Sequence, residues 1–209
     1  MNVYNINMAG LLIAIEGING CGKTTIINNI LKYYKDKKEV VVYKFPNRTT
    51  KYGKILDKFL KKEIQIESKY DILDLFTKNR QEFQDSILND IKANKIVICD
   101  RYTISGIVYQ IPLYANEESY KYYYQLLNYF DKHTHIPNLT FLIDGDFLHL
   151  RDDVSQRYHY NSNTSNQIFN IFNKILNCSN QEYIIVSNKV NDINYASDTI
   201  IYNIQKLLE

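Results

Sequence analysis

The chain has 209 residues, of which 45% are hydrophobic and 23% charged, a composition typical of one globular domain with a sizeable core. Its formal net charge of +2 indicates no basic surface for nucleic acid, and no apolar run approaches the length of a membrane span. We therefore expect a single domain over residues 1–209 that binds small molecules, without nucleic acid or membrane as a partner.

The cysteines indicate the compartment. Cys21, Cys99 and Cys178 are odd in number and lack metal-ligand spacing, and residues 1–10 lack the basic and apolar blocks of a secretory signal. These features favour a reducing, intracellular compartment. We expect the cytoplasm, with the nucleus as the alternative.

The first predicted strand, LLIAIE at 11–16, leads directly into a phosphate-binding motif. Residues 17–24 satisfy GxxxxGK[ST], a glycine-rich loop whose backbone N–H groups surround phosphates at the start of a helix. Lys23 is expected to reach the outer phosphates of a nucleoside triphosphate, and the Thr24 hydroxyl to ligate Mg²⁺. We interpret Cys21 as a small filler rather than a redox group. The predicted triphosphate-binding residues are Gly17, Ile18, Asn19, Gly20, Cys21, Gly22, Lys23, Thr24 and Thr25.

Four further strand-like runs follow: EVVVYKF at 39–45, KIVICD at 95–100, LTFLID at 139–144 and EYIIVS at 182–187. Segments with helical periodicity separate them, which predicts a three-layer α/β sandwich with a central parallel sheet. Ligands of such sheets bind at the carboxyl ends of the strands. The phosphate loop, FPNRTT, CDRYTISG and IDGD should therefore meet at one edge.

Two arginines follow predicted strand ends. Arg48 comes after the second strand and Arg101 after the third, so both guanidiniums are expected to converge on the crevice opposite the phosphate loop. Asp100, at the end of the third strand, can hold a metal-bound water. No general base is legible, and an anionic phosphate acceptor needs none. The set favours phosphoryl transfer by positioning and charge neutralisation.

The tract at 68–94 has the periodicity of one long helix. On one interpretation Arg80 extends past the core to water. On the other, Phe76 is a flat surface on which a base stacks, and Arg80, one turn away, donates a hydrogen bond to a base carbonyl. Periodicity alone does not choose between them. The predicted stripe comprises Ile72, Phe76, Arg80, Gln84, Ile87 and Ile91.

Two segments later in the chain have unusual compositions. SYKYYYQLLNYF at 119–130 carries five tyrosines on a helical pattern, for which we favour core packing or a subunit interface over stacking on nucleic acid. DDVSQRYHYNSNTSN at 152–166 is polar and lies between two helical patterns. We interpret it as part of a lid at about 151–165, with a disordered surface loop as the alternative.

Together, EGINGCGKTT, FPNRTTKYG, LFTKNRQEF and DRYTISGIVY resemble the thymidylate kinases, with FPNRTT and LFTKNRQEF most similar to members from eukaryotes and large DNA viruses. The similarity runs from about residue 10 to residue 205. It implies a P-loop fold of the nucleoside monophosphate kinase type, transfer of the ATP γ-phosphate to dTMP to give dTDP with Mg²⁺ bound, and a homodimer.

The resemblance also implies residue roles. Phe76 would stack on thymine and Arg80 would bond its carbonyl, while Arg48 and Arg101 would grip the dTMP phosphate and Tyr109 would crowd a ribose 2′-OH. The implied acceptor residues are Asn19, Phe45, Pro46, Arg48, Phe76, Arg80, Arg101, Ser105, Gly106, Tyr109 and Tyr158. The implied catalytic residues are Lys23, Arg101, Arg151 and Arg157, with Thr24 and Asp100 at the metal.

The chain departs from the family pattern at two positions. Asn19 stands where an acidic residue is usual near the acceptor 3′-hydroxyl, so the affinity for the acceptor and the tolerance of 3′-modified nucleotides are open. His159 stands where the lid usually has an acidic residue. Gly20 replaces a basic residue found in some members, which places more of the transition-state charge on the lid arginines Arg151 and Arg157.

Parts of the sequence are compatible with three alternative functions. A deoxynucleoside kinase shares the phosphate loop but must deprotonate a hydroxyl, and no carboxylate base follows the second strand. A regulatory GTPase is suggested by SNKVND at 187–192, but Asn191 stands where the guanine motif has Asp. A catalytically weak nucleotide-binding scaffold is motivated by Asn19 and His159, and the intact Lys23 and Arg101 argue against it.

Overall fold

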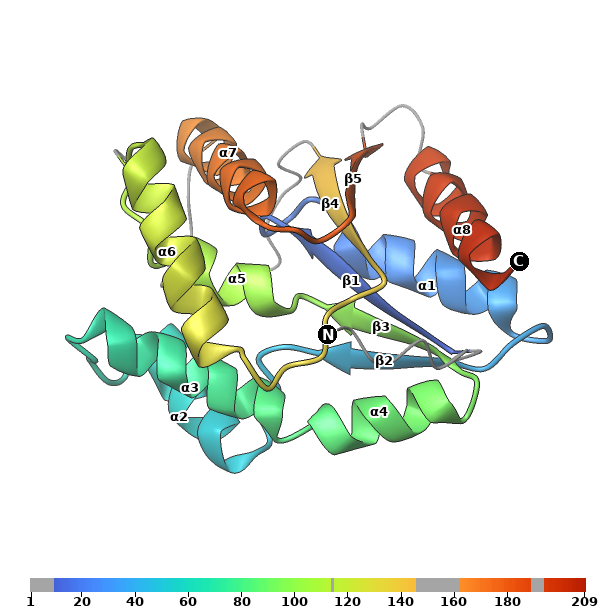
Figure 1. Cartoon of the computed structure of the whole chain (residues 1–209), viewed down its shortest axis with the longest axis horizontal. Helices are drawn as coiled ribbons and strands as arrows, with labels where there is room; N and C mark the ends of the chain where they lie inside the picture. Colours follow the sequence, from blue (N-terminus) through green and yellow to red (C-terminus); the bar gives the residue numbers. More distant parts are fainter. Residues whose placement is uncertain (1–9, 114, 146–161, 189–193) are drawn as a thin grey trace, which may run out of the picture.

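The computed structural model describes residues 10–113, 115–145, 162–188 and 194–209, and its five strands form one parallel sheet. The strand order is β2-β3-β1-β4-β5, with β1 in the centre (Figure 1). Each strand matches a run predicted from the sequence to within about a residue at either end. The strands are β1 (Leu11–Gly17), β2 (Val40–Lys44), β3 (Ile96–Asp100), β4 (Leu139–Gly145) and β5 (Tyr183–Asn188).

The parallel register brings the predicted site segments to one edge of the sheet. Asp100 of β3 pairs with Ile15 of β1 and with Lys44 of β2, while Gly17 pairs with Ile143 of β4. The carboxyl ends of β1, β2, β3 and β4 therefore lie at the same edge of the sheet, as predicted.

Helices cover both faces of the sheet, which confirms the α/β layers (Figure 1). Ile13 of β1 belongs to the same core cluster as Ile26, whereas its neighbour Leu12 belongs to a second cluster with Ile87. Because successive side chains of a strand point to opposite faces, Leu12 and Ile13 point to opposite sides of the sheet. The first cluster also includes Ile104 and Ile171, so it extends over both sides. On one side are α1 (Lys23–Tyr34) and α8 (Tyr195–Leu208), and on the other α4 (Gln84–Lys92), α5 (Thr103–Val108) and α7 (Ser162–Cys178).

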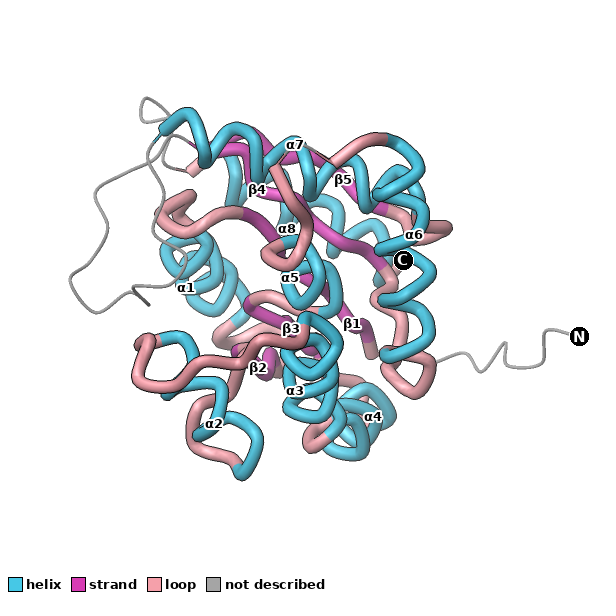
Figure 2. The backbone as a smooth tube through the Cα atoms, turned by 90° about the vertical axis from the view of Figure 1, so that its left-hand side faces the viewer, coloured by secondary structure: helices cyan, strands magenta, loops and turns pink. Residues whose placement is uncertain are grey.

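Three helices pack outside this sandwich: α2 (Lys51–Leu60), α3 (Lys69–Gln81) and α6 (Glu117–Phe130). Thr50, Ser68 and Asn116 cap their N-termini, each side-chain oxygen accepting a hydrogen bond from a backbone N–H of the first turn. The helices α2 and α3 pack together, and α5 lies between α3 and α7 (Figure 2). The short helix α5 thus joins the outer layer to the sheet.

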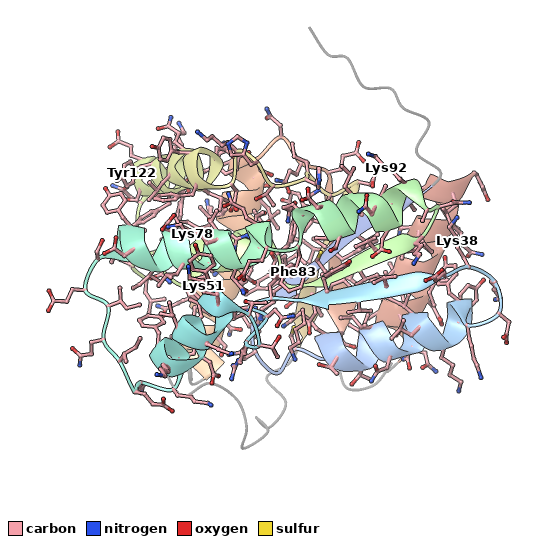
Figure 3. The ribbon with its side chains drawn as sticks, turned by 90° about the horizontal axis from the view of Figure 1, so that it is seen from below. Lys38, Lys51, Lys78, Phe83, Lys92 and Tyr122 are labelled. Atoms are coloured by element: carbon pink, nitrogen blue, oxygen red, sulfur yellow. The ribbon has the colours of Figure 1, made fainter. Side chains whose placement is uncertain are left out.

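The tract predicted as one long helix is divided in two. The helix α3 ends at Gln81 and α4 begins at Gln84. Phe83 lies at the break (Figure 3). Its ring packs edge-on against Tyr43 and Phe45, with ring centroids 5.8 and 5.7 Å apart. Tertiary packing therefore overrides a periodicity that continues unbroken through the sequence, and the predicted stripe does not lie on a single helix.

Two other expectations change with the structure. The helix α7 begins at Ser162, so residues 162–165 of the segment predicted as a lid are helical, whereas residues 151–161 lie outside the described residues. In α6, Tyr120 is buried but Tyr122 and Tyr129 are exposed, so core packing explains only part of the tyrosine cluster.

Within the described ranges, no helix combines the length and the apolar character needed to cross a membrane.

Candidate active site

The phosphate loop connects β1 to α1, and a side chain of β5 holds it in place. Asn188, the last residue of β5, donates a hydrogen bond of 2.8 Å from Nδ2 to the carbonyl of Cys21. Gly22 has a φ of 92°, and a Cβ there would lie 2.2 Å from the Asn188 amide nitrogen. Only glycine fits both the backbone conformation and the space. The sequence analysis did not assign Asn188 to this loop.

Lys23 points back into the loop. Its Nζ donates to the carbonyls of Gly17 and Ile18, at 3.0 and 2.6 Å, and contacts Cys21 Sγ at 3.5 Å. Burial and then the nearby charge of Arg101 lower the pKa of Lys23, and Asp100 partly opposes both. A phosphate in the loop would neutralise this buried ammonium, which fits the predicted role of Lys23.

Arg101 links the phosphate loop to α5. Its backbone is left-handed, with a φ of 66°, and its guanidinium turns toward β1. Nη1 donates to the Gly17 carbonyl at 2.7 Å and to Ser105 Oγ at 3.1 Å, and it lies 3.4 Å from the hydroxyl oxygen of Tyr109. Nη2 donates to Asn19 Oδ1 at 2.5 Å. The structure therefore brings together Asn19, Arg101, Ser105 and Tyr109, four of the residues that the resemblance assigns to the acceptor site.

Glu16, which the sequence analysis did not single out, fixes the turn after Arg101. The fully buried carboxylate accepts hydrogen bonds from the backbone N–H of Tyr102 at 2.9 Å and of Ser105 at 3.1 Å, and from the Ser105 hydroxyl. These bonds satisfy two of the backbone donors at the N-terminus of α5, those of Tyr102 and Ser105. A carboxylate that ends an otherwise apolar strand is the signal that could have found it, because a buried charge requires partners.

The segment that carries Arg48 is held by α3. The buried side chain of Asn79 accepts from the backbone N–H of Asn47 at 2.8 Å and donates to the Asn47 carbonyl at 3.0 Å and to Thr50 Oγ1 at 2.8 Å. Arg48 itself is exposed and pairs with Asp57 of α2 at 2.9 Å. The position of Arg48 is thus set by Asn79, a second residue that the sequence analysis missed.

The other two predicted residues of this segment differ in burial. Phe45 is buried among core residues beside Tyr102, with ring centroids 5.9 Å apart, whereas Pro46 is half-buried. Phe45 therefore packs mainly within the protein, and Pro46 is the more open of the two.

Arg80 is buried, which rules out the interpretation that it extends to water. Its side chain is 1% exposed and forms a salt bridge with Asp131, which follows α6. Nε and Nη2 donate to Asp131 Oδ1 at 3.2 and 2.9 Å, and Nη2 also donates to Oδ2 at 2.7 Å and to Thr77 Oγ1 at 3.0 Å. Phe76, one turn away, is half-buried at the edge of a cluster of Phe59, Leu60 and Ile72.

Gly106 provides the space for this guanidinium. A Cβ at position 106 would stand 2.7 Å from Nη1 of Arg80 and 3.3 Å from its Cζ. Ser105 and Gly106 were predicted to shape the acceptor wall, and the structure places each against a different site arginine, Arg101 and Arg80 respectively.

The predicted metal residues offer oxygen donors at this edge of the sheet. Asp100 is buried at the end of β3, with Lys44 Nζ 3.8 Å from its carboxylate, and Thr24 is exposed in the first turn of α1. A carboxylate and a hydroxyl beside a phosphate loop fit Mg²⁺, which prefers oxygen ligands and keeps several waters. Arg151, Arg157, Tyr158 and His159 lie outside the described residues.

A family model described as thymidylate kinase matches residues 15–196 of the chain. The chain belongs to the thymidylate kinase family. A solved structure of thymidylate kinase from Candida albicans has the same fold, with a TM-score of 0.68 and 24% identity, over 96% of this chain and 94% of that one.

Curated thymidylate kinases from viruses and a yeast match half of the chain. A putative thymidylate kinase of Invertebrate iridescent virus 6 is 43% identical over 103 residues, which are 49% of this chain and 48% of the relative. Thymidylate kinase of African swine fever virus (isolate Pig/Kenya/KEN-50/1950) is 42% identical over 103 residues, 49% of this chain and 43% of the relative. For the Schizosaccharomyces pombe enzyme the identity is 37% over 101 residues, 48% of each. The chain thus spans about half the length of the curated relatives it matches.

Proposed function

We propose that the protein transfers the γ-phosphate of ATP to dTMP, giving dTDP. The position of Arg101 carries this proposal: one guanidinium contacts Gly17 and Asn19 of the phosphate loop as well as Ser105 and Tyr109. A cation between a donor loop and an acceptor wall can stabilise charge on a phosphoryl group in transit. Membership of the thymidylate kinase family supports dTMP as the acceptor.

On the donor side, the backbone N–H groups of residues 17–25 would hold the ATP phosphates, with Lys23 moving from its loop carbonyls to the outer phosphates. Thr24 and Asp100 would hold Mg²⁺, Asp100 through a water. Mg²⁺ would neutralise phosphate charge and align the transferred group. These residues position the donor, and none of them needs to move a proton.

On the acceptor side, thymine would stack on Phe76 and accept a hydrogen bond from Arg80. Arg48 would leave Asp57 for the dTMP phosphate, an exchange between two anionic partners at an exposed site. Tyr109 would crowd a ribose 2′-OH, and Asn19, which engages Arg101, would lie near the 3′-hydroxyl. The lid residues Arg151, Arg157 and Tyr158 would close over the phosphates and exclude water.

We also propose that the enzyme is a homodimer in the cytoplasm. The exposed Tyr122 and Tyr129 on α6 are suited to a subunit contact, and the thiols of Cys21, Cys99 and Cys178 are all free, as expected in a reducing compartment. Sedimentation should give twice the 24.7 kDa of one chain. A monomer at enzymatic concentrations would remove the dimer from the proposal but leave the activity intact.

The decisive experiment is phosphoryl transfer from ATP with Mg²⁺ to a panel of dTMP, dUMP, dGMP, dCMP, AMP, UMP and thymidine. Preference for dTMP is the expected result. Transfer to thymidine alone would identify a deoxynucleoside kinase instead. Tight ATP binding without transfer to any acceptor would identify a nucleotide-binding scaffold.

A further inference from the structure

The Arg80–Asp131 pair is built to hold one guanidinium in a single orientation. Both side chains are buried, and Asp131 contacts Arg80 through both carboxylate oxygens. Asp131 is itself held, because Thr134 Oγ1 donates to its Oδ1 at 3.0 Å. The backbone of Arg80 is held as well, because Gln84 Nε2 donates to the Arg80 backbone carbonyl at 3.0 Å. Neither partner is free to turn.

The pairing divides the donors of Arg80 into two groups. A guanidinium has five N–H donors, and Asp131 and Thr77 engage those on Nε and Nη2. Within the part of the chain that the structure describes, Nη1 donates no hydrogen bond. Nη1 faces Gly106, whose lack of a side chain admits it. Two donors on one nitrogen therefore remain for a ligand.

A donor in a fixed place discriminates between bases. Arginine can donate hydrogen bonds but cannot accept them, so Nη1 complements a ring carbonyl and opposes a ring amino group. Thymine carries a carbonyl at the ring position where cytosine carries an amino group. Sites that use a buried polar group in this way reject the mismatched ligand strongly, because the group is left unpaired.

We propose that Asp131 is a positioning residue for base selection: by engaging Nε and Nη2 of Arg80, it directs Nη1 to the acceptor and makes the enzyme prefer dTMP to dCMP. This inference rests on the proposed function. The buried negative charge also neutralises Arg80 in place, so that the guanidinium is not drawn toward the acceptor phosphate. Asp131 itself need not touch the nucleotide.

The test compares kcat/KM for dTMP with kcat/KM for dCMP in the wild type, Asp131→Asn, Arg80→Met and the double variant. Asp131→Asn should lower the dTMP preference by about 10- to 100-fold, the range expected for losing a hydrogen bond to a charged group. Its KM for ATP should change by less than about twofold, since the donor side is untouched. The double variant should lose no more preference than Arg80→Met alone, because Asp131 acts through Arg80.

Asp57→Asn is the matched control, because Asp57 pairs with the other acceptor-side arginine, Arg48. Its effect should be equal for dTMP and dCMP, which share the phosphate. Thr134→Ala is the milder variant if Asp131→Asn does not fold, and it should lower the dTMP preference to a smaller extent.

Two results would overturn the inference. An equal loss of dTMP and dCMP turnover in Asp131→Asn, or in Thr134→Ala if that variant has to be used, would make Asp131 merely structural. If the dTMP preference of the double variant fell by the product of the two single losses, Asp131 would act on base selection independently of Arg80. A wild-type enzyme that does not phosphorylate dTMP would instead remove the proposed function, and the inference with it.

Discussion

Before any nucleotide binds, Lys23, Arg48 and Arg101 of the candidate site are already held by partners within the protein. Lys23 donates to two backbone carbonyls, Arg101 to a carbonyl and the Asn19 amide, and Arg48 to a carboxylate. Neutral partners are displaced by phosphate more easily than a carboxylate in the same place would be. Asn19 therefore leaves Arg101 readier to meet a phosphate than an acidic residue at position 19 would.

Replacing Arg101 with alanine should lower kcat by about 10³-fold or more, because the residue contacts both sides of the candidate site and arginines that stabilise this type of transition state contribute on that scale. Initial rates at saturating ATP and dTMP measure it. Arg48→Ala serves as the comparison, with its main effect on the KM for dTMP. A variant of Arg101 that keeps most of its turnover would exclude the proposed role.

Lys23→Met should abolish most turnover without destabilising the protein. The substitution removes a charge that is buried in the absence of phosphate, so the free energy of unfolding should stay within about 1 kcal/mol of wild type or rise. Denaturant unfolding without nucleotide measures it. Lys32→Met, at an exposed position of the same helix, should change neither property. A large loss of stability in Lys23→Met would show that the hydrogen bonds of Lys23 to the loop carbonyls stabilise the fold by more than its buried charge destabilises it.

The same residue should leave a signature in the pH dependence of stability. Because the pKa of Lys23 is lowered in the folded protein, the unfolded chain binds more protons at this site between the folded value and 10.5. The contribution of Lys23 to the free energy of unfolding therefore increases as pH rises through that interval. In Lys23→Met this gain should be absent, which unfolding curves collected at several pH values would reveal.

The site residues found from sequence alone are those whose motif is local. Lys23 and Thr24 follow from the spacing of one loop, and Arg101 from its place after a strand. Glu16 and Asp131 could not be assigned in that way, because their partners are distant: Arg80 and Asp131 are 51 residues apart. Nothing in a single sequence pairs one carboxylate with one guanidinium over that separation.

At the scale of elements, the strands were predictable because each is a short apolar run, and β1 and β3 are buried on both faces. The division between α3 and α4 was not, since it depends on Phe83 packing against Tyr43 and Phe45, about 40 residues earlier in the chain. The order of the strands in the sheet was not predicted either. Local pattern fixes which segments form strands, whereas long-range packing decides which strands are neighbours.

The helix α1 carries one buried group that opposes stability. The hydroxyl of Tyr34 has no hydrogen-bond partner among the residues that the structure describes. Tyr34→Phe should therefore raise the free energy of unfolding at pH 7 by about 1 kcal/mol, because an unpaired buried hydroxyl is removed. Tyr43→Phe is the contrasting control, since the Tyr43 hydroxyl donates to Asp90 at 2.7 Å and its loss should destabilise. A destabilised Tyr34→Phe would mean that the hydroxyl is satisfied by water.

Tyr34 should also contribute to unfolding in alkali. Burial raises the pKa of Tyr34 from its ordinary value of 10.0 to about 12, so the folded state favours the protonated phenol. The stability that this provides is complete below pH 10 and is lost as pH rises toward 12. Tyr34→Phe should flatten part of that decline, and the rest should remain because burial also raises the pKa of Tyr43 and Tyr102.

At the scale of the whole molecule, nucleotide binding should be visible as stabilisation. The phosphate loop draws on β1, α1 and Asn188 of β5, so a bound nucleotide ties together elements from both ends of the sequence. ATP with Mg²⁺ at about 100 times its Kd should add about 2.7 kcal/mol to the free energy of unfolding. Thermal unfolding with increasing ATP measures it, with AMP as the weaker control. A melting temperature unaffected by ATP would contradict binding at this loop.

The central place of β1 in the sheet also affects how the chain folds during its synthesis. Residues 11–17 are synthesised before their sheet partners, residues 96–100 and 139–145. An apolar strand without neighbours is prone to aggregation until those partners have been synthesised. Because Gly17 pairs with Ile143, a nascent chain that stops before β4 lacks one wall of its nucleotide site. Nucleotide can thus assist folding only after residues 139–145 have been translated.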